Sequence, residues 1–207
     1  MRIGILGGSF NPPHLGHLSL ARTVLGLELV DRVCFIPAAV PPHKARPDET
    51  PETRLAMTRL LVEEDERLLV DDLELHRGGP SFTIDTLETL AARHPGTTYR
   101  LVIGSDLAKT FATWREYSKI LRLAPPLVAE RPDSLFQGID DYPGLSAEEI
   151  GIMTAGRFAM EHVDISSTLV RRLVGEGADD ETLLTMLTPA VLRYVRERHL
   201  YENLSHS

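Results

Sequence analysis

The residues that first point to chemistry are two histidines in a glycine-rich turn. Residues 7–17 read Gly-Gly-Ser-Phe-Asn-Pro-Pro-His-Leu-Gly-His and follow a short apolar run. His14 and His17 are three residues apart at the start of an expected helix, so they share one face of it. Backbone N–H groups and the helix dipole favour an anion there, and two imidazoles add donors. A phosphate site, an ordinary capped helix end and a metal pair all remain open from these residues alone.

A second helix start carries a similar set of donors. Ser166, Ser167 and Thr168 precede an apolar helical segment, and Arg171 follows one turn later. Three hydroxyls, free backbone amides and a guanidinium suit a single anion. Serine and threonine are also the preferred helix caps, so plain capping is the alternative. Taken together, the two helix starts suit opposite ends of a triphosphate.

The elements that must position these residues alternate between strands and helices. Apolar runs and turn residues predict strands at 2–6, 31–36, 68–70, 99–103 and 126–129, with an edge strand at 158–163. Helical periodicity predicts helices at 17–29, 53–64, 81–90, 114–121, 166–175 and 188–198, and residues 132–150 are expected to form a surface loop. This alternation predicts a doubly wound, mostly parallel α/β sheet with ligands at the carboxyl ends of its strands.

Length and composition limit the classes of protein. With 207 residues, 43% apolar and 25% charged, the chain predicts a single domain over 1–207 with a C-terminal helical segment at 166–200. The net charge of −8 makes nucleic acid an unfavourable partner. The absence of a long apolar run excludes a membrane-spanning helix, and with no signal-peptide core we expect a cytoplasmic protein. The single cysteine, Cys34, is expected to be buried, and oligomeric state stays open, including a homo-oligomer.

The segment 7–17 resembles the H-x-G-H signature of the nucleotidyltransferase superfamily. Within it, the chain resembles the bacterial nicotinate mononucleotide adenylyltransferases over nearly its whole length. Further motifs of that family occur in the family's order: Ile36-Pro37, Pro41-Pro42-His43-Lys44, Pro80-Ser81-Phe82-Thr83, Ile103-Gly104-Ser105-Asp106, Thr113-Trp114 and Ile165-Ser166-Ser167-Thr168 with Arg171. The resemblance implies a Rossmann-like nucleotidyltransferase fold and adenylyl transfer from ATP to nicotinate mononucleotide, giving nicotinate adenine dinucleotide and pyrophosphate in NAD biosynthesis.

Direct in-line attack without a covalent enzyme intermediate is implied, with Mg²⁺ held mainly by the ATP phosphates. Positioned donors would then carry the catalysis. The resemblance assigns the catalytic residues as His14, His17, Lys44 and Arg171. It assigns ATP binding to Gly7, Gly8, Ser9, Phe10, Gly16, Gly104, Asp106, Ser166, Ser167 and Thr168. Asp106 would accept hydrogen bonds from a ribose, with a helix N-cap as the alternative.

For the mononucleotide, the resemblance implies contacts from His43, Phe82, Thr83, Trp114 and Arg131. The start of the expected helix at 81–90 offers free amides and the Thr83 hydroxyl to the carboxylate of nicotinate. Trp114 would stack on the pyridine ring, unless it is a partly buried core residue. Arg131 would take the mononucleotide phosphate, unless it is a solvent-facing strand end. No protein ligand of a metal is assigned.

One departure from the family and three rival functions accompany this hypothesis. Ala38-Ala39 stand where related enzymes often carry polar residues, which leaves backbone groups and His43 for contacts from that loop. The runner-up within the superfamily is phosphopantetheine adenylyltransferase, which lacks the Pro-Ser-Phe-Thr and Thr-Trp segments. A cytidylyltransferase fits less well. A regulatory module that binds ATP without turnover is the alternative from a different class.

Overall fold

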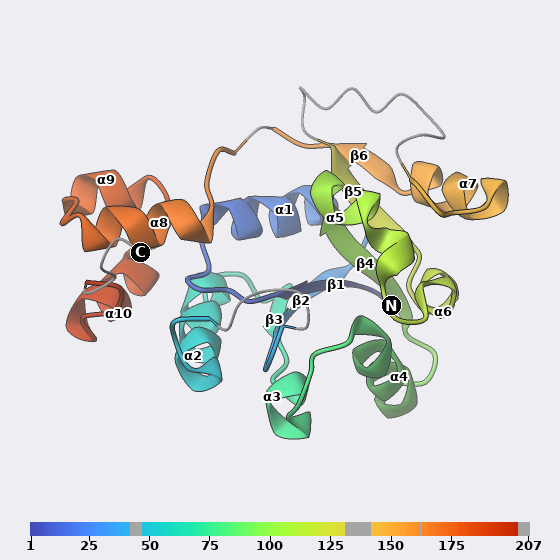
Figure 1. Cartoon of the computed structure of the whole chain (residues 1–207), viewed down its shortest axis with the longest axis horizontal. Helices are drawn as coiled ribbons and strands as arrows, with labels where there is room; N and C mark the ends of the chain where they lie inside the picture. Colours follow the sequence, from blue (N-terminus) through green and yellow to red (C-terminus); the bar gives the residue numbers. More distant parts are fainter. Residues whose placement is uncertain (42–46, 131–141, 162, 203–207) are drawn as a thin grey trace.

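The computed structural model describes residues 1–41, 47–130, 142–161 and 163–202, and its six named strands form one parallel sheet (Figure 1). The order is β3-β2-β1-β4-β5-β6, and every neighbouring pair is parallel. The strands are β1 (Arg2–Gly8), β2 (Arg32–Pro37), β3 (Leu68–Val70), β4 (Thr98–Gly104), β5 (Pro126–Glu130) and β6 (Arg157–Ala159). The expected doubly wound α/β fold is confirmed.

Short helices cover both faces of the sheet. The helices that precede β4 in the chain are α1 (Leu15–Gly26), α2 (Pro51–Val62), α3 (Leu73–Arg77) and α4 (Thr83–Arg93). After β4 come α5 (Ser105–Lys109), η1 (Phe111–Thr113), α6 (Tyr117–Leu123), α7 (Ala147–Ala155), α8 (Ser167–Gly175), α9 (Asp180–Leu184) and α10 (Pro189–Glu197). Figure 1 shows α1 on one side of the sheet, α3 and α4 on the other, and α8 to α10 gathered at one end.

Alternating strand residues supply two separate cores. Leu6, Phe35 and Val102 pack in the cluster that contains α1, α2, α8 and α10. Ile5, Ile36 and Ile103, one residue away on each strand, pack in the cluster that contains α4, α6 and α7. Because successive strand residues point to opposite faces, near-continuous apolar strands are what a doubly covered sheet needs.

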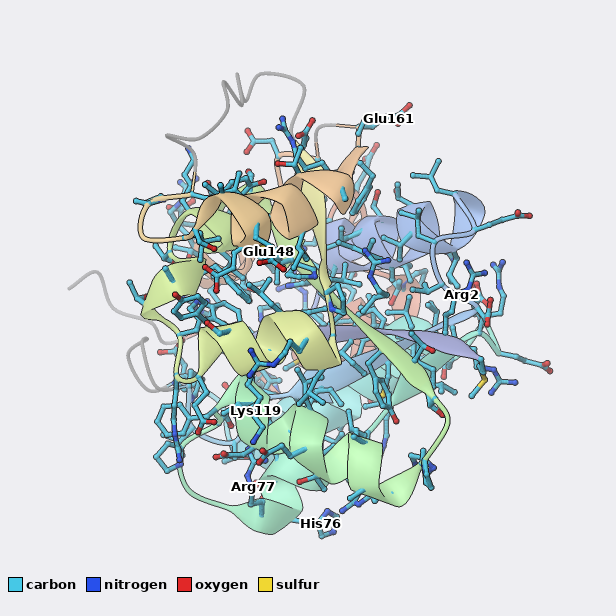
Figure 2. The ribbon with its side chains drawn as sticks, turned by 90° about the vertical axis from the view of Figure 1, so that its right-hand side faces the viewer. Arg2, His76, Arg77, Lys119, Glu148 and Glu161 are labelled. Atoms are coloured by element: carbon cyan, nitrogen blue, oxygen red, sulfur yellow. The ribbon has the colours of Figure 1, made fainter. Side chains whose placement is uncertain are left out.

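An ion pair at the surface joins two helices on the same face of the sheet. Figure 2 shows Lys119 of α6 beside α4, where its ammonium forms an ion pair with Glu88. His76 on α3 and Glu161 beyond β6 lie at opposite ends of the same view. No helix in the described ranges is long and apolar enough to cross a membrane.

Two expectations about local structure were wrong in part. The helix expected at 114–121 begins only at Tyr117, as α6. Trp114 is extended (ψ 144°) at the end of η1, and Glu116 has a φ of 52°, so the backbone between η1 and α6 is not helical. This leaves Trp114 in a connecting segment. In the loop expected at 132–150, the described part contains the start of α7, whose N-cap Ser146 and Glu149 form a capping box. Residues 132–141 lie outside the described ranges.

Other boundaries moved by a few residues. The helix expected at 81–90 is α4, which starts at Thr83 because Phe82 is an extended N-cap (ψ 129°). The edge strand expected at 158–163 is the three-residue β6. The hydroxyl-capped starts of α8 and α10 are confirmed, with Ser166 and Thr188 each accepting a backbone N–H three residues on.

Candidate active site

The site lies where the winding of the sheet reverses. Chain order runs outward in one direction from β1 to β3 and in the other from β4 to β6, so β1 and β4 are neighbours at the reversal. A crevice opens outside the carboxyl ends of strands at such a point. Gly8 ends β1 and Gly104 ends β4, so both glycine segments singled out from the sequence meet at this edge.

Two cavities share the turn that follows β1. The larger, about 570 Å³, is lined on one side by residues 6–11 and on another by residues 102–107. The smaller, about 390 Å³, lies against Phe82, Thr83, Trp114 and Arg115. Gly7, Gly8, Ser9 and Leu107 line both. A molecule in each cavity would therefore meet its neighbour at this turn.

The larger cavity collects most of the residues that the resemblance assigned to catalysis and to ATP binding. Its lining includes Gly7, Gly8, Ser9, Phe10, His14, Gly16, His17, Gly104, Asp106, Ser167, Thr168 and Arg171. Asp106 lies in the first turn of α5, whose N-cap is Gly104, so the capping alternative for Asp106 does not hold. Ser166 is absent from this lining, and its hydroxyl accepts the Leu169 N–H as the cap of α8.

His14 and His17 form a stacked pair at the start of α1. Their ring centroids are 3.8 Å apart, and the backbone N–H of His14 donates to Nδ1 of the His17 ring at 3.2 Å. A nitrogen that accepts this bond carries no proton, so we assign the proton of His17 to Nε2. Burial lowers the pKa of His14 from 6.5 to about 4, so His14 is neutral at pH 7. The pair thus offers N–H donors to an anion without two repelling charges.

Gly16 makes room for this arrangement. A Cβ atom added there would lie 3.0 Å from His14 Nδ1, closer than ordinary van der Waals contact. His14 Nδ1 is also buried without a hydrogen-bond partner among the described residues. An unpaired acceptor costs less than an unpaired donor, so the proton of His14 also belongs on Nε2. The glycine between the histidines therefore serves the packing of the first ring.

Arg171 of α8 reaches back to the β1 turn. Its Nη1 donates to the Asn11 carbonyl at 2.8 Å, and its Nε pairs with Asp48 Oδ2 at 3.0 Å. Ser167 Oγ donates to the Pro12 carbonyl at 2.8 Å, which joins the start of α8 to the same segment. The two donor-rich helix starts identified in the sequence are therefore brought together.

The smaller cavity collects the residues expected for a mononucleotide. Phe82 and Thr83 are at the start of α4, and Trp114 packs on Phe111 with ring centroids 5.3 Å apart. Trp114 is half-buried, so it is both a core residue on one side and part of the cavity wall on the other. His43 and Lys44 fall in 42–46 and Arg131 in 131–141, outside the described residues, and their roles stay predictions.

Sequence reasoning missed two buried charged residues that hold these walls. Arg54 of α2 is fully buried, and it donates to the carbonyls of Ser9, Ala38 and Glu49. Glu74 of α3 accepts a bond from the Thr86 hydroxyl, and burial raises its pKa. Ser81 Oγ, a further partner of Glu74, accepts the Ala39 N–H at 2.9 Å.

We predict that His14 makes stability depend on pH. The folded chain holds this imidazole neutral to about pH 4, whereas the unfolded chain protonates it near 6.5. The unfolded state therefore binds more protons in that window, so stability falls as pH drops from 6.5 to 4, by up to about 3 kcal/mol from this group. Thermal unfolding of His14→Asn should show a flatter pH profile over this window than the wild type.

His94→Gln, on the exposed surface, controls for the loss of an imidazole. The melting temperature of this variant should depend on pH between 4 and 6.5 as steeply as that of the wild type. An equally steep profile in His14→Asn would contradict the burial argument.

Comparison with known proteins agrees with the fold and shows the family. The cytidylyltransferase-like family model matches residues 5–173. Probable nicotinate-nucleotide adenylyltransferases from Geobacter sp. (strain M21) and Halalkalibacterium halodurans are 36% and 35% identical, covering 97% of this chain and 98% and 91% of their own. The solved nicotinic acid mononucleotide adenylyltransferase of Plasmodium falciparum, complexed with NaAD, superposes with a TM-score of 0.74 at 20% identity over 99% of both chains. The chain thus belongs to the nicotinate-nucleotide adenylyltransferases of the cytidylyltransferase-like family, a family of nucleotidyltransferases.

Proposed function

We propose that this chain transfers the adenylyl group of ATP to nicotinate mononucleotide, giving nicotinate adenine dinucleotide and pyrophosphate as a step of NAD biosynthesis. The observation that carries the proposal is the pair of cavities that share Gly7, Gly8 and Ser9. One cavity is rich in donors for phosphates and the other has an aromatic wall. Family membership supports the same reaction.

ATP would occupy the larger cavity. Its phosphates suit the ring N–H donors of His14 and His17, the Gly16 amide in the first turn of α1, and, at the start of α8, the Thr168 hydroxyl with the amides of Ser167 and Thr168. Arg171 would hold the β and γ phosphates from the opposite side, since α8 brings it back to the β1 turn. Gly104 and Asp106 line the part of the cavity next to β4, where the ribose would accept or donate hydrogen bonds.

Nicotinate mononucleotide would occupy the smaller cavity. Trp114 offers its exposed side to the pyridine ring, and the free amides at the start of α4 with Thr83 suit a carboxylate. Arg115 adds a positive charge to this wall, with its guanidinium carbon 4.9 Å from the Phe82 ring centroid. A wall of donors leaves the N–H groups of nicotinamide unpaired, so the acid should be preferred over the amide.

The chemical step would be a direct displacement at the α-phosphorus. An oxygen of the mononucleotide 5′-phosphate forms the new bond to phosphorus, and the bond to the β-phosphate oxygen breaks to release pyrophosphate. The attacking phosphate is already ionised, so no protein nucleophile or base is required. The imidazole N–H donors and Arg171 would stabilise the charge that builds on the leaving group. Lys44 would add a further positive charge.

Mg²⁺ would enter bound to the triphosphate. The lining of the larger cavity contains imidazoles, hydroxyls and amides, and also the carboxylates of Asp48, Asp106, Glu130 and Glu161. The described residues contain no group of three or more His, Cys, Asp or Glu side chains that would hold an ion. We therefore assign the metal to the phosphate oxygens and water. There it would offset the negative charge of the leaving pyrophosphate.

The experiment that tests the function is pyrophosphate release with ATP and Mg²⁺ against nicotinate mononucleotide, nicotinamide mononucleotide and phosphopantetheine. We expect strong release with the nicotinate compound, weaker release with its amide and none with phosphopantetheine. Preference for phosphopantetheine would overturn the choice of substrate. Binding of ATP without release of pyrophosphate from any acceptor would identify a binding module instead.

His17→Ala is the negative control for that assay. Loss of one donor aimed at the transition state should reduce turnover roughly 100-fold or more. His17 is only half-buried, so the circular dichroism spectrum should be unchanged. A folded variant with near wild-type turnover would contradict the role of the histidine pair.

We predict that Trp114→Leu raises the KM for nicotinate mononucleotide roughly tenfold while the KM for ATP changes little, because a stacked ring is lost from one cavity only. Tyr117→Leu is the matched control, since Tyr117 contacts the same Phe111 but does not line the cavity. An equal rise in both KM values for Trp114→Leu would mean that Trp114 serves only the core.

A further inference from the structure

Tyr201, at the end of the described chain, touches the catalytic segment 190 residues away. Its hydroxyl donates to Asn11 Oδ1 at 2.9 Å in a buried contact. We infer that Tyr201 is a positioning residue for the ATP site, acting through Asn11 on the guanidinium of Arg171. This inference rests on the proposed role of Arg171 toward the ATP phosphates.

Three hydrogen bonds meet at Asn11, and they fix how its side chain must lie. Besides the bond from Tyr201, Asn11 Nδ2 donates to Asp48 Oδ2 at 3.1 Å, and the Asn11 carbonyl accepts Arg171 Nη1 at 2.8 Å. The reverse orientation of the amide would place its oxygen against the Asp48 carboxylate. Tyr201 as a donor and Asp48 as an acceptor therefore select the same orientation.

Asn11 connects Tyr201 to the two groups that hold the Arg171 guanidinium. Asp48 Oδ2 accepts a hydrogen bond from Asn11 Nδ2 and forms an ion pair with Arg171 Nε, so one carboxylate oxygen joins the amide to the guanidinium. The other anchor is the Asn11 backbone itself. A long arginine side chain loses much rotamer freedom when it is held in one geometry. Because two contacts already hold Arg171 before ATP binds, ATP binding costs less side-chain entropy.

Tyr201 is suited to hold Asn11 in place. It is 4% exposed and packs in the core that contains α1, α2, α8 and α10. Burial raises the pKa of its phenol, so the hydroxyl keeps its proton and remains a donor. The backbone at Tyr201 has a φ of 66°, uncommon for a residue with a side chain, and the preceding Leu200 N–H donates to the Val195 carbonyl. The turn after α10 thus directs the ring inward.

The alternative is a tyrosine that only fills the core and satisfies its own hydroxyl. Tyr99 is such a residue: it is also 4% exposed, and its hydroxyl donates to the Leu90 carbonyl at 3.1 Å. Tyr99 is near the start of β4, at the opposite end of the strand from Gly104. Tyr99→Phe is therefore a matched control that removes a buried phenol hydroxyl away from the site.

The test is a double-mutant cycle on the Kd of ATP with Mg²⁺, measured by titration calorimetry in the absence of acceptor. Tyr201→Phe keeps the ring and removes the hydroxyl, and we expect it to weaken ATP binding roughly three- to tenfold. In the background of Arg171→Ala the same change should alter the Kd less than about twofold, because the group it positions is gone. Tyr99→Phe should leave the Kd unchanged.

Each result decides the inference. Equal weakening by Tyr201→Phe with and without Arg171, or an unchanged Kd beside a lowered melting temperature, would assign Tyr201 a purely structural role. Pyrophosphate release by the wild type with nicotinate mononucleotide is measured in parallel. Its failure would overturn the proposed reaction while the cycle still measures coupling to Arg171, and loss of all ATP binding by the wild type would overturn both.

Discussion

The site depends on the burial of one cation, Arg54. Its guanidinium donates to the carbonyls of Ser9, Ala38, Ala39 and Glu49, four backbone groups from three separate segments. Removing a charge from water is costly, and burial accordingly lowers the pKa of Arg54, so full hydrogen bonding is what makes the arrangement tolerable. The contacts fix the turn after β1 relative to the loop after β2, and that turn forms the wall between the two cavities.

The remaining polar contacts extend the same frame. Asn11 and Ser167 connect the β1 segment to Arg171 and to α8, while Glu74 and Ser81 connect the start of α4 to the loop at Ala39. The helix that carries the proposed phosphate donors and the helix that carries the proposed carboxylate donors are thus held against one turn. A displacement between two anionic reactants needs donors that are already in place before the substrates bind. Such donors lower the barrier by aligning the two reactants and by stabilising the charge on the leaving group.

Periodic features were the predictable part. Apolar strands between amphipathic segments were sufficient for the parallel sheet, and Ser166 and Thr188 marked two helix starts correctly. Contacts between residues that are far apart in the sequence could not be predicted from periodicity. Arg54 and Tyr201 carry no local pattern, since their partners are up to 190 residues away and become neighbours only in the fold. Trp114 was placed in a helix because the break between η1 and α6, with an extended Trp114 and a φ of 52° at Glu116, leaves no mark in the local periodicity. The capping box at Ser146 and Glu149 was a local signal that could have been found.

In the proposed reaction, the two cavities bring an acceptor phosphate to the α-phosphorus of ATP. The most direct measurement follows radioactive phosphate from ATP labelled at either the α or the γ position, with nicotinate mononucleotide as acceptor. We expect the α label to appear in the dinucleotide product and the γ label in pyrophosphate. Transfer of the γ label to the mononucleotide, or release of the γ label as free phosphate with no labelled dinucleotide, would contradict it.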